Sequence, residues 1–182
     1  MRNYLLRVWN VVDPIYYACS RLHYVVENQA DDNRTLFRVR MTTYQGREVK
    51  LQDGTIIRKH DLLLKIHLHN VRMLNDLQMI NNETKRALYT YQKVKQALPR
   101  LAYYVKVHPK SSQIKGVVGI TSLNKGANRL GFEAFPIENT YYRTYKKLSF
   151  LLIHFIANTK RKDPVYLFMS KDILINKYRS SI

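Results

Sequence analysis

Two segments of the chain alternate apolar and polar residues and are predicted to be β-strands. Residues 37–42 (FRVRMT) and 61–69 (DLLLKIHLH) both follow a period of two, which sends successive side chains to opposite faces of a sheet. In the first segment, Arg38 and Arg40 share the polar side. The polar side of the second segment carries Asp61, Lys65, His67 and His69, and Asn70 follows its end. If the two strands are neighbours and their polar sides coincide, these groups gather on one face.

The dipeptide Asp53-Gly54 predicts a β-hairpin. It lies between two short strand-type segments, 48–51 and 55–57. A two-residue Asp-Gly connection is a strong hairpin signal, because glycine readily adopts the positive φ that such turns require. Two further short strands are predicted at 133–136 and 165–169.

Helical spacing of apolar residues predicts the remaining elements. Asn81 or Asn82 is expected to cap a helix that Pro99 kinks or ends, and Ser111 or Ser112 to cap another. The predicted helical segments are 4–26 (with a break near its middle), 71–80, 83–98, 111–128, 139–162 and 172–178. Together these elements predict an α+β fold in which a small antiparallel sheet with a β-hairpin packs against several helices, as a single domain over residues 1–182.

The charge of the chain is its most informative compositional feature. Lys and Arg number 31 against 13 Asp and Glu, a net charge of +18, which attracts anionic lipid, acidic polymers or nucleic acid. The single cysteine, Cys19, cannot form an intramolecular disulfide, so we expect a cytoplasmic location or a peripheral one at the inner face of the membrane. The most apolar segment, 148–157, has about half the length of a bilayer span, and no transmembrane segment is predicted.

The polar side of segment 61–69 is the first candidate site. His67 and His69 are spaced so that both can reach one metal ion or one anionic group. Catalytic zinc needs three protein ligands, and no other histidine stands in ligand-like spacing, so no metal and no cofactor is predicted. The candidate anion-binding residues are Arg38, Arg40, Lys65, His67, His69 and Asn70, with Asp61 as a polar-pocket partner. The alternative is a solvated sheet face whose histidines pack beside helices.

The basic, tyrosine-rich helix predicted at 139–162 is the second candidate. Arg143, Lys146 and Lys147 precede its apolar centre and are candidate contacts to an anionic membrane surface. The alternative is an ordinary core helix with basic ends, in which Leu148 belongs to the buried stripe. The motif Ser112-x-x-Lys115 also matches a pattern of serine acyl-enzymes, but its companion motifs S-D-N and K-T-G are absent, and a helix cap is preferred.

Several of these segments together resemble the uncharacterised YkoP-like domain family of Bacillus-type bacteria. The resemblance covers most of the chain and rests on residues 4–14 (YLLRVWNVVDP), 37–40, 53–54, 61–70, 119–132 (GITSLNKGANRLGF) and 166–171 (YLFMSK). It implies a short single-domain protein, similar to domains attached to polysaccharide deacetylases, and hence a role near cell-envelope glycan chemistry. It supplies no catalytic residues.

Three functions are compatible with these patterns. The first is a non-catalytic binding or accessory module for an anionic envelope component, a lipid headgroup or an acidic polymer. The second is an enzyme that uses His67 or His69 as acid or base beside Asp61 and Lys65, since histidine titrates near neutral pH. The third is nucleic-acid binding, which the 14 tyrosines among the basic residues allow, although no nucleic-acid-binding motif is present.

Overall fold

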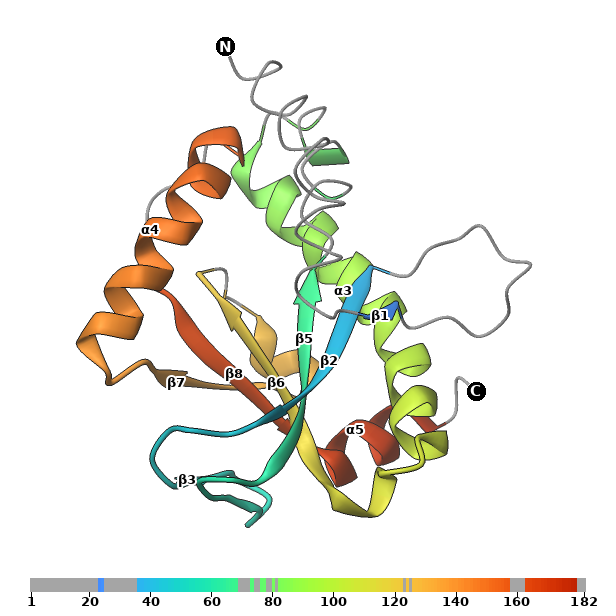
Figure 1. Cartoon of the computed structure of the whole chain (residues 1–182). Coiled ribbons are helices and arrows are strands. Elements are labelled where there is room, and N and C mark those ends of the chain that lie inside the picture. Colours follow the sequence, from blue (N-terminus) through green and yellow to red (C-terminus); the bar gives the residue numbers. More distant parts are fainter. Residues whose placement is uncertain are drawn as a thin grey trace.

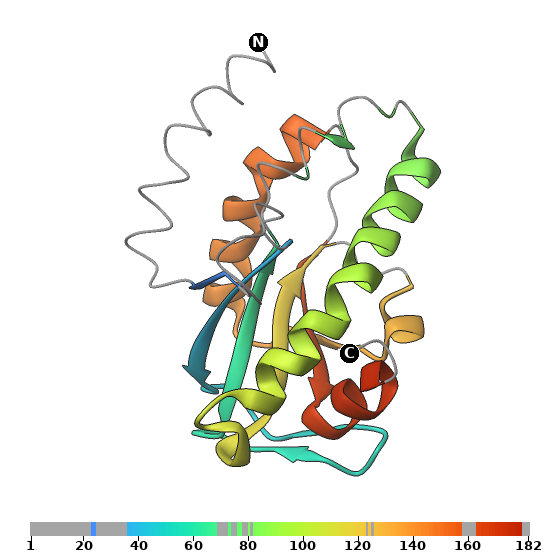
Figure 2. The ribbon, with the colours of Figure 1, turned by 90° about the vertical axis from the view of Figure 1, so that its right-hand side faces the viewer.

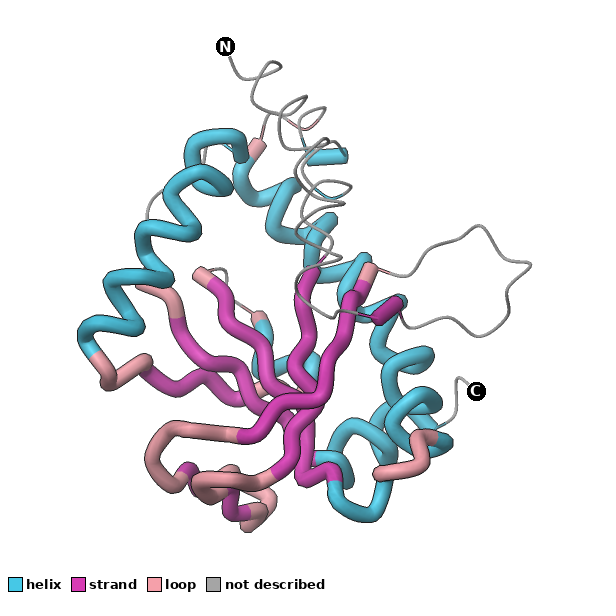
Figure 3. Tube along the Cα trace, viewed as in Figure 1, coloured by secondary structure: helices cyan, strands magenta, loops and turns pink. Residues whose placement is uncertain are grey.

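A six-stranded sheet forms the centre of the molecule (Figure 1). The computed structural model describes residues 23–24, 36–68, 73, 76–77, 80, 82–122, 124, 126–157 and 163–179. The strands of the sheet are β1 (His23–Tyr24), β2 (Phe37–Thr43), β5 (Leu62–Leu68), β6 (Ile114–Thr121), β7 (Glu133–Pro136) and β8 (Val165–Ser170). Their order is β1-β2-β5-β6-β8-β7 (Figure 3), and the β5–β6 pair alone among these neighbours is parallel.

Helices cover the sheet from both sides. Among the residues that the structure describes, the continuous helices are α3 (Glu83–Val107), α4 (Thr140–Ala157) and α5 (Lys171–Tyr178). Helices α3 and α5 lie on one face of the sheet and α4 on the other (Figure 2). The predicted α+β class is therefore confirmed, with a larger sheet than expected and one parallel neighbour pair.

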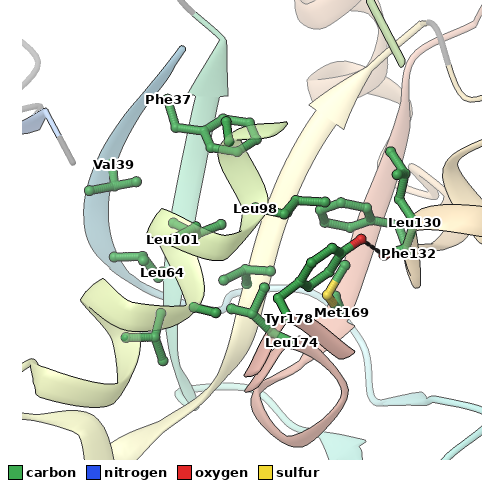
Figure 4. Packing of buried hydrophobic residues seen from close by; sticks show 14 of the residues in the cluster. Phe37, Val39, Leu64, Leu98, Leu101, Leu130, Phe132, Met169, Leu174 and Tyr178 are labelled. Atoms are coloured by element: carbon green, nitrogen blue, oxygen red, sulfur yellow. Dashed lines mark hydrogen bonds between the residues drawn. The ribbon is translucent and has the colours of Figure 1, made fainter. Parts of the chain in front are cut away.

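The main hydrophobic core lies between the sheet and helices α3 and α5. Leu98 and Leu101 of α3 pack with Val39 and Leu64 of the sheet in one buried cluster (Figure 4). Within this core the hydroxyl of Tyr178 donates a hydrogen bond of 2.9 Å to the carbonyl oxygen of Leu130. This face of β2 and β5 is the apolar side predicted from the alternating pattern.

A second, smaller core lies on the opposite face, under the predicted hairpin. Strands β3 (Val49–Lys50) and β4 (Ile56–Ile57) pair antiparallel and form their own two-stranded sheet. The hairpin is confirmed, but its connection is longer than two residues, because the amide of Leu51 donates to the carbonyl of Thr55 at 2.9 Å. Gly54 has a φ of +84°, the left-handed conformation for which glycine was expected. Buried residues of this smaller core are Tyr44, Leu51, Ile57, Leu63, Val118 and Phe168.

Helix α3 begins as predicted and ends later. The side chain of Asn82 accepts hydrogen bonds from the amides of Thr84 and Lys85, at 2.8 and 3.1 Å, and so caps the helix. Pro99 was expected to kink or end this helix, yet the helix continues through it to Val107. Since residues on both sides of Pro99 are buried against the sheet, tertiary packing offsets the hydrogen bond that proline removes.

The helix predicted at 111–128 is wrong. Only Ser111–Gln113 form a short 3-10 turn, and the following residues form the long strand β6. The run of β-branched residues in IKGVVGIT suits a central strand, and a Cβ at Gly116 would lie 2.4 Å from the carbonyl oxygen of Met169 on β8. Because Ser112 lies in this turn and Lys115 in the strand, the Ser-x-x-Lys pair does not share a helix.

Most other predicted elements are confirmed where the structure describes them. Strands β7 and β8 and helices α4 and α5 lie within a few residues of their predicted positions. The helical segment predicted at 4–26 lies outside the described residues except for His23–Tyr24, which are strand β1 rather than helix because they pair with β2. The helix predicted at 71–80 lies largely outside the described residues.

A candidate anion site on the basic face of the sheet

The register of two strands brings four basic side chains together. Strands β2 and β5 are antiparallel neighbours in which Arg38 lies opposite His67 and Arg40 lies opposite Lys65. Residues directly opposite in an antiparallel pair point to the same side of the sheet. The polar sides of the two strands therefore coincide, as the candidate site required, on the face turned away from α3.

Helix α4 adds a fifth basic group, Lys146. Its positive charge acts on both Lys65 and His67, and that of Arg40 acts on Lys146 in turn. The ammonium group also lies 5.4 Å from the ring centroid of Tyr142. We call Arg38, Arg40, Lys65, His67 and Lys146 the basic cluster.

Aromatic stacking connects α4 to the sheet beside the basic cluster. The ring of Tyr142 stacks on that of Tyr166 from β8, with centroids 6.4 Å apart and an angle of 19° between the planes. Tyr142 and Lys146 are four residues apart and lie on the same side of the helix. The stacking therefore turns Lys146 toward the sheet.

The cationic members of the basic cluster are held partly away from water. Arg38 is 5% exposed, and Arg40, Lys65 and Lys146 are of intermediate burial. Burial, followed by the positive charges of Lys146 and Arg40, lowers the pKa of Lys65 to about 8. Burial and Arg40 also lower the pKa of Lys146. Positive charge is thus concentrated where its solvation is poor.

His67 is a neutral member of the basic cluster at physiological pH. Burial, followed by the charges of Lys65, Arg40, Lys146 and Arg38, lowers its pKa to about 3. Its Nε2 atom is buried and has no hydrogen-bond partner among the residues that the structure describes. A buried polar atom without a partner is costly, and a ligand that supplied one would remove that cost.

This arrangement suits a phosphate or carboxylate group. Guanidinium groups keep their charge and donate two parallel hydrogen bonds to such anions, while lysine adds a more flexible point charge. A neutral imidazole can donate its N–H to an anionic oxygen or accept from a hydroxyl group. The basic cluster thus offers fixed positive charge together with one orienting polar atom.

Asp61 is not brought into the basic cluster. It precedes β5, and its carboxylate accepts a hydrogen bond of 2.8 Å from the amide of Arg58 in the turn that leads into the strand. This turn contains His60 with a φ of 74°, and it lies at the opposite end of β5 from His67. The structure therefore gives Asp61 a turn-closing role in place of the predicted partnership.

The other predicted site residues separate into distinct positions. His69 and Asn70 lie outside the described residues. Lys147 is exposed and forms a salt bridge of 2.8 Å with Asp163, and Arg143 is half-buried. Lys146 was predicted as a membrane contact, and the structure places it beside the sheet; its four-residue spacing from Tyr142 shows that the two share one side of the helix, but no sequence signal shows that this side faces the sheet. No group of three potential metal ligands occurs in the part of the chain that the structure describes.

The fold and the basic cluster define a small α+β domain with a half-buried basic site. The chain belongs to the YkoP domain family, whose model matches residues 2–178. It is 44% identical to the uncharacterized protein YkoP of Bacillus subtilis (strain 168), over 98% of each chain. The predicted family resemblance is confirmed. No solved structure matches the chain, and none of the described helices has the length and apolar character needed to cross a membrane.

Proposed function

We propose that this protein is a non-catalytic binding module whose basic cluster binds an anionic group of a cell-envelope component. The observation that supports the proposal best is the clustering of Lys65, Lys146 and two arginines, partly buried, on one face of the sheet. Crowded, poorly solvated like charges destabilise a fold. An anionic ligand would offset the cost of burying the protonated forms of Lys65 and Lys146, and anion binding is therefore the role that we propose for the basic cluster.

The envelope component is a lipid headgroup or an acidic polymer, which share phosphate or carboxylate chemistry. We place the protein in the cytoplasm or at the inner face of the membrane, where anionic headgroups are accessible. The likeness to domains attached to polysaccharide deacetylases supports a role near the envelope by association alone. The basic cluster supports anion binding on physical grounds, so the two arguments are independent.

Calorimetric titration with inorganic phosphate and with glycerol 3-phosphate at low ionic strength tests the proposal. We expect both probes to bind, and Lys65→Met to weaken binding about tenfold or more, since charge-assisted hydrogen bonds contribute about 1.5–3 kcal/mol each. The matched control is Lys93→Met, which removes one exposed charge from α3 on the opposite side of the sheet. The proposal is wrong if neither probe binds, or if the two variants weaken binding equally.

The enzyme alternative retains part of its support. A lysine with a pKa of about 8 can act as a general base, and the buried Nε2 atom of His67 has no hydrogen-bond partner among the described residues. The same geometry separates Asp61 from both residues, which removes the acidic member of the predicted set. Turnover of a phosphate or acyl ester that Lys65→Met abolishes would favour this alternative over binding alone.

The nucleic-acid alternative predicts different effects of the Lys65→Met and Lys93→Met variants. Labelled single and double strands would bind with a steep dependence on salt, and the loss of one charge at Lys65 or at Lys93 would have a similar effect, because backbone contacts spread over many phosphates. A small half-buried cluster, by contrast, predicts that only Lys65→Met changes affinity strongly.

A further inference from the structure

Lys65 is a half-buried lysine whose charged neighbours are cations. The charges that act on it are those of Lys146 and Arg40, both positive. The carboxylate that precedes β5, Asp61, binds a turn amide instead, and Asp163 pairs with an exposed lysine of α4. These surroundings therefore favour the neutral amine of Lys65 over its ammonium form.

The amine of Lys65 keeps contact with solvent. The residue is of intermediate burial, so part of its side chain is accessible. Its nitrogen forms no hydrogen bond or ion pair with another described residue, and it is not one of the fully buried nitrogens, unlike the Nε2 atom of His67. A nitrogen that is neither bonded nor fully buried can be reached by small solutes.

Two cations lie beside this amine. Arg40 is directly opposite Lys65 in the β2–β5 pair, where Cβ atoms are about 4.5–5.5 Å apart. Helix α4 adds Lys146, whereas Leu148, which was expected in a buried stripe of the same helix, is 68% exposed. Guanidinium and ammonium groups bind phosphate. A phosphate group held by Arg40 and Lys146 would therefore lie next to the Lys65 nitrogen.

Lys65 also carries much nucleophilic free amine near neutral pH. Burial, and then the charges of Lys146 and Arg40, lower its pKa to about 8. At pH 8 about half of such an amine is uncharged, against roughly 0.3% for a lysine of ordinary pKa. Desolvation and a neighbouring cation are recurrent means of activating a nucleophilic lysine. The structure thus combines a reactive amine with groups that attract phosphate.

We propose that Lys65 is an acylation site for acyl phosphates. The phosphate group binds to Arg40 and Lys146, and the Lys65 nitrogen attacks the adjoining carbonyl carbon. A C–N bond forms, the bond from that carbon to the phosphate oxygen breaks, and the amine loses one proton. Inorganic phosphate leaves with that proton as HPO₄²⁻, and an amide remains on Lys65.

The basic cluster favours this reaction electrostatically. Its cations stabilise the negative charge that develops on the carbonyl oxygen and on the departing phosphate. The amide product is neutral, so the repulsion of Lys65 by Lys146 and Arg40 is removed. Loss of this charge weakens anion binding, which makes acylation a means of regulating the basic cluster. The inference rests on the proposed anion site and adds a reaction to it.

Mass spectrometry after incubation with acetyl phosphate tests the inference. The full chain is incubated with acetyl phosphate at pH 8, digested at intervals and analysed for acetylated lysines. We expect acetylation of Lys65 to be about tenfold faster than that of the exposed Lys93 on α3, because Lys65 has far more free amine. Excess inorganic phosphate should slow the reaction at Lys65 and leave that at Lys93 unchanged.

An electrophile without phosphate separates guidance by the basic cluster from simple reactivity of the amine. N-hydroxysuccinimidyl acetate should prefer Lys65 over Lys93 at least about threefold less than acetyl phosphate does, since binding of the phosphate group raises the local concentration of the electrophile. Inorganic phosphate should not slow this second reaction.

Two arginine variants form a matched pair. Arg40→Gln should slow acetylation of Lys65 by acetyl phosphate about tenfold, since it removes a charge-assisted contact to the phosphate and restores basicity to the amine. Arg129→Gln removes an exposed arginine from the turn that packs on the main core and should change the rate by less than about twofold. Circular dichroism confirms that both variants are folded.

Equal acetylation of Lys65 and Lys93 in the unmodified chain would overturn the inference. So would an absence of competition by inorganic phosphate at Lys65, or equal rates in the two arginine variants. Calorimetric titration with phosphate distinguishes this failure from that of the proposed function. Phosphate binding without preferred acetylation leaves the anion site in place, whereas an absence of phosphate binding contradicts both proposals.

Discussion

The two faces of the central sheet differ in the burial and charge of side chains that are neighbours in sequence. On the face toward α3 and α5, Leu64 is fully buried in the main core. On the opposite face, the next residue, Lys65, is half-buried among other cations. The same difference separates Val39 from Arg40 on β2. One strand pair therefore carries fully buried apolar side chains on one side and half-buried cations on the other.

This contrast indicates which part of the sheet stabilises the fold most and which part is available for function, since the basic cluster shares its face with the smaller core. Apolar burial on the first face contributes roughly 25 cal/mol for each square ångström removed from water. The basic cluster opposes folding, because burial and like charge both disfavour its protonated lysines. Natural proteins retain such conflicts mainly at functional sites.

The largest expected effect tests the apolar face. Leu64→Ala removes a fully buried side chain between β5 and α3 and should lower the free energy of unfolding by about 2–5 kcal/mol, the usual cost of a cavity in a core. Urea denaturation measures this loss. The control is Lys115→Ala on the neighbouring strand, whose exposed side chain should matter by less than about 0.5 kcal/mol. An equal loss in the two variants would contradict the assignment of the faces.

The alternating pattern predicted this division of the sheet well. A period of two in residues 37–42 and 61–69 depends only on the local chain, and it placed Arg38 beside Arg40 and Lys65 beside His67. That the two pairs share one side of the sheet follows from the strand register, which the pattern left open. The hairpin at Asp53-Gly54 was equally local, since one glycine with positive φ is enough to direct it.

Elements that depend on distant partners were not predicted. Strand β6 was expected to be a helix because Ser111 and Ser112 resemble caps and the glycines obscure its period. Its strand form is set by β5 and β8 on either side, where Gly116 allows close approach of the Met169 carbonyl. Lys146 reaches the basic cluster only because α4 folds over the sheet from far along the chain. No local pattern contains that information.

The second expected effect tests the basic face through pH. The pKa of Lys65 is about 8 in the folded protein and near its ordinary value of 10.5 when unfolded. Between these values the unfolded chain binds more protons, so the free energy of unfolding rises with pH. Below pH 8 the penalty is fully present, and Lys65→Met should be more stable than the unmodified protein by about 2–3 kcal/mol at pH 7. This advantage should shrink between pH 8 and 10.

Parallel urea denaturation of both proteins at pH 7, 8, 9 and 10 measures this difference and cancels the titration of shared tyrosines. A constant difference across the series would show that Lys65 is not destabilised in the fold. Phosphate should also bind more weakly as pH rises through about 8, because deprotonation of Lys65 removes one of the charges that meet it.

A third, smaller effect tests the junction where the two faces meet at the end of β8. Ser170 caps α5 by accepting a hydrogen bond of 3.1 Å from the amide of Ile173, and its hydroxyl donates to Asp53 in the hairpin. It thereby links the α5 side of the sheet to the hairpin side. Ser170→Ala should cost about 1–2 kcal/mol, typical of a lost cap.

Asp53→Asn provides the comparison for that junction, since it weakens the hairpin contact and leaves the cap in place. Thermal denaturation of both variants should show the larger loss for Ser170→Ala. If Asp53→Asn costs as much, the hairpin link rather than the cap dominates, and the two faces depend on each other more than their separate cores suggest.

The smallest expected effect concerns what holds α4 on the basic face. The salt bridge between Lys147 and Asp163 is 2.8 Å long, but both side chains are exposed, and such pairs contribute about 0–1 kcal/mol. The stack of Tyr142 on Tyr166 excludes more apolar surface from water and is far less sensitive to salt. Asp163→Asn should therefore change the free energy of unfolding by less than about 0.5 kcal/mol, while Tyr142→Ala costs more. If Asp163→Asn proves the more damaging change at low salt and the loss disappears at high salt, α4 is held on the sheet by charge rather than by aromatic contact. The position of α4 over the basic face would then itself depend on electrostatics.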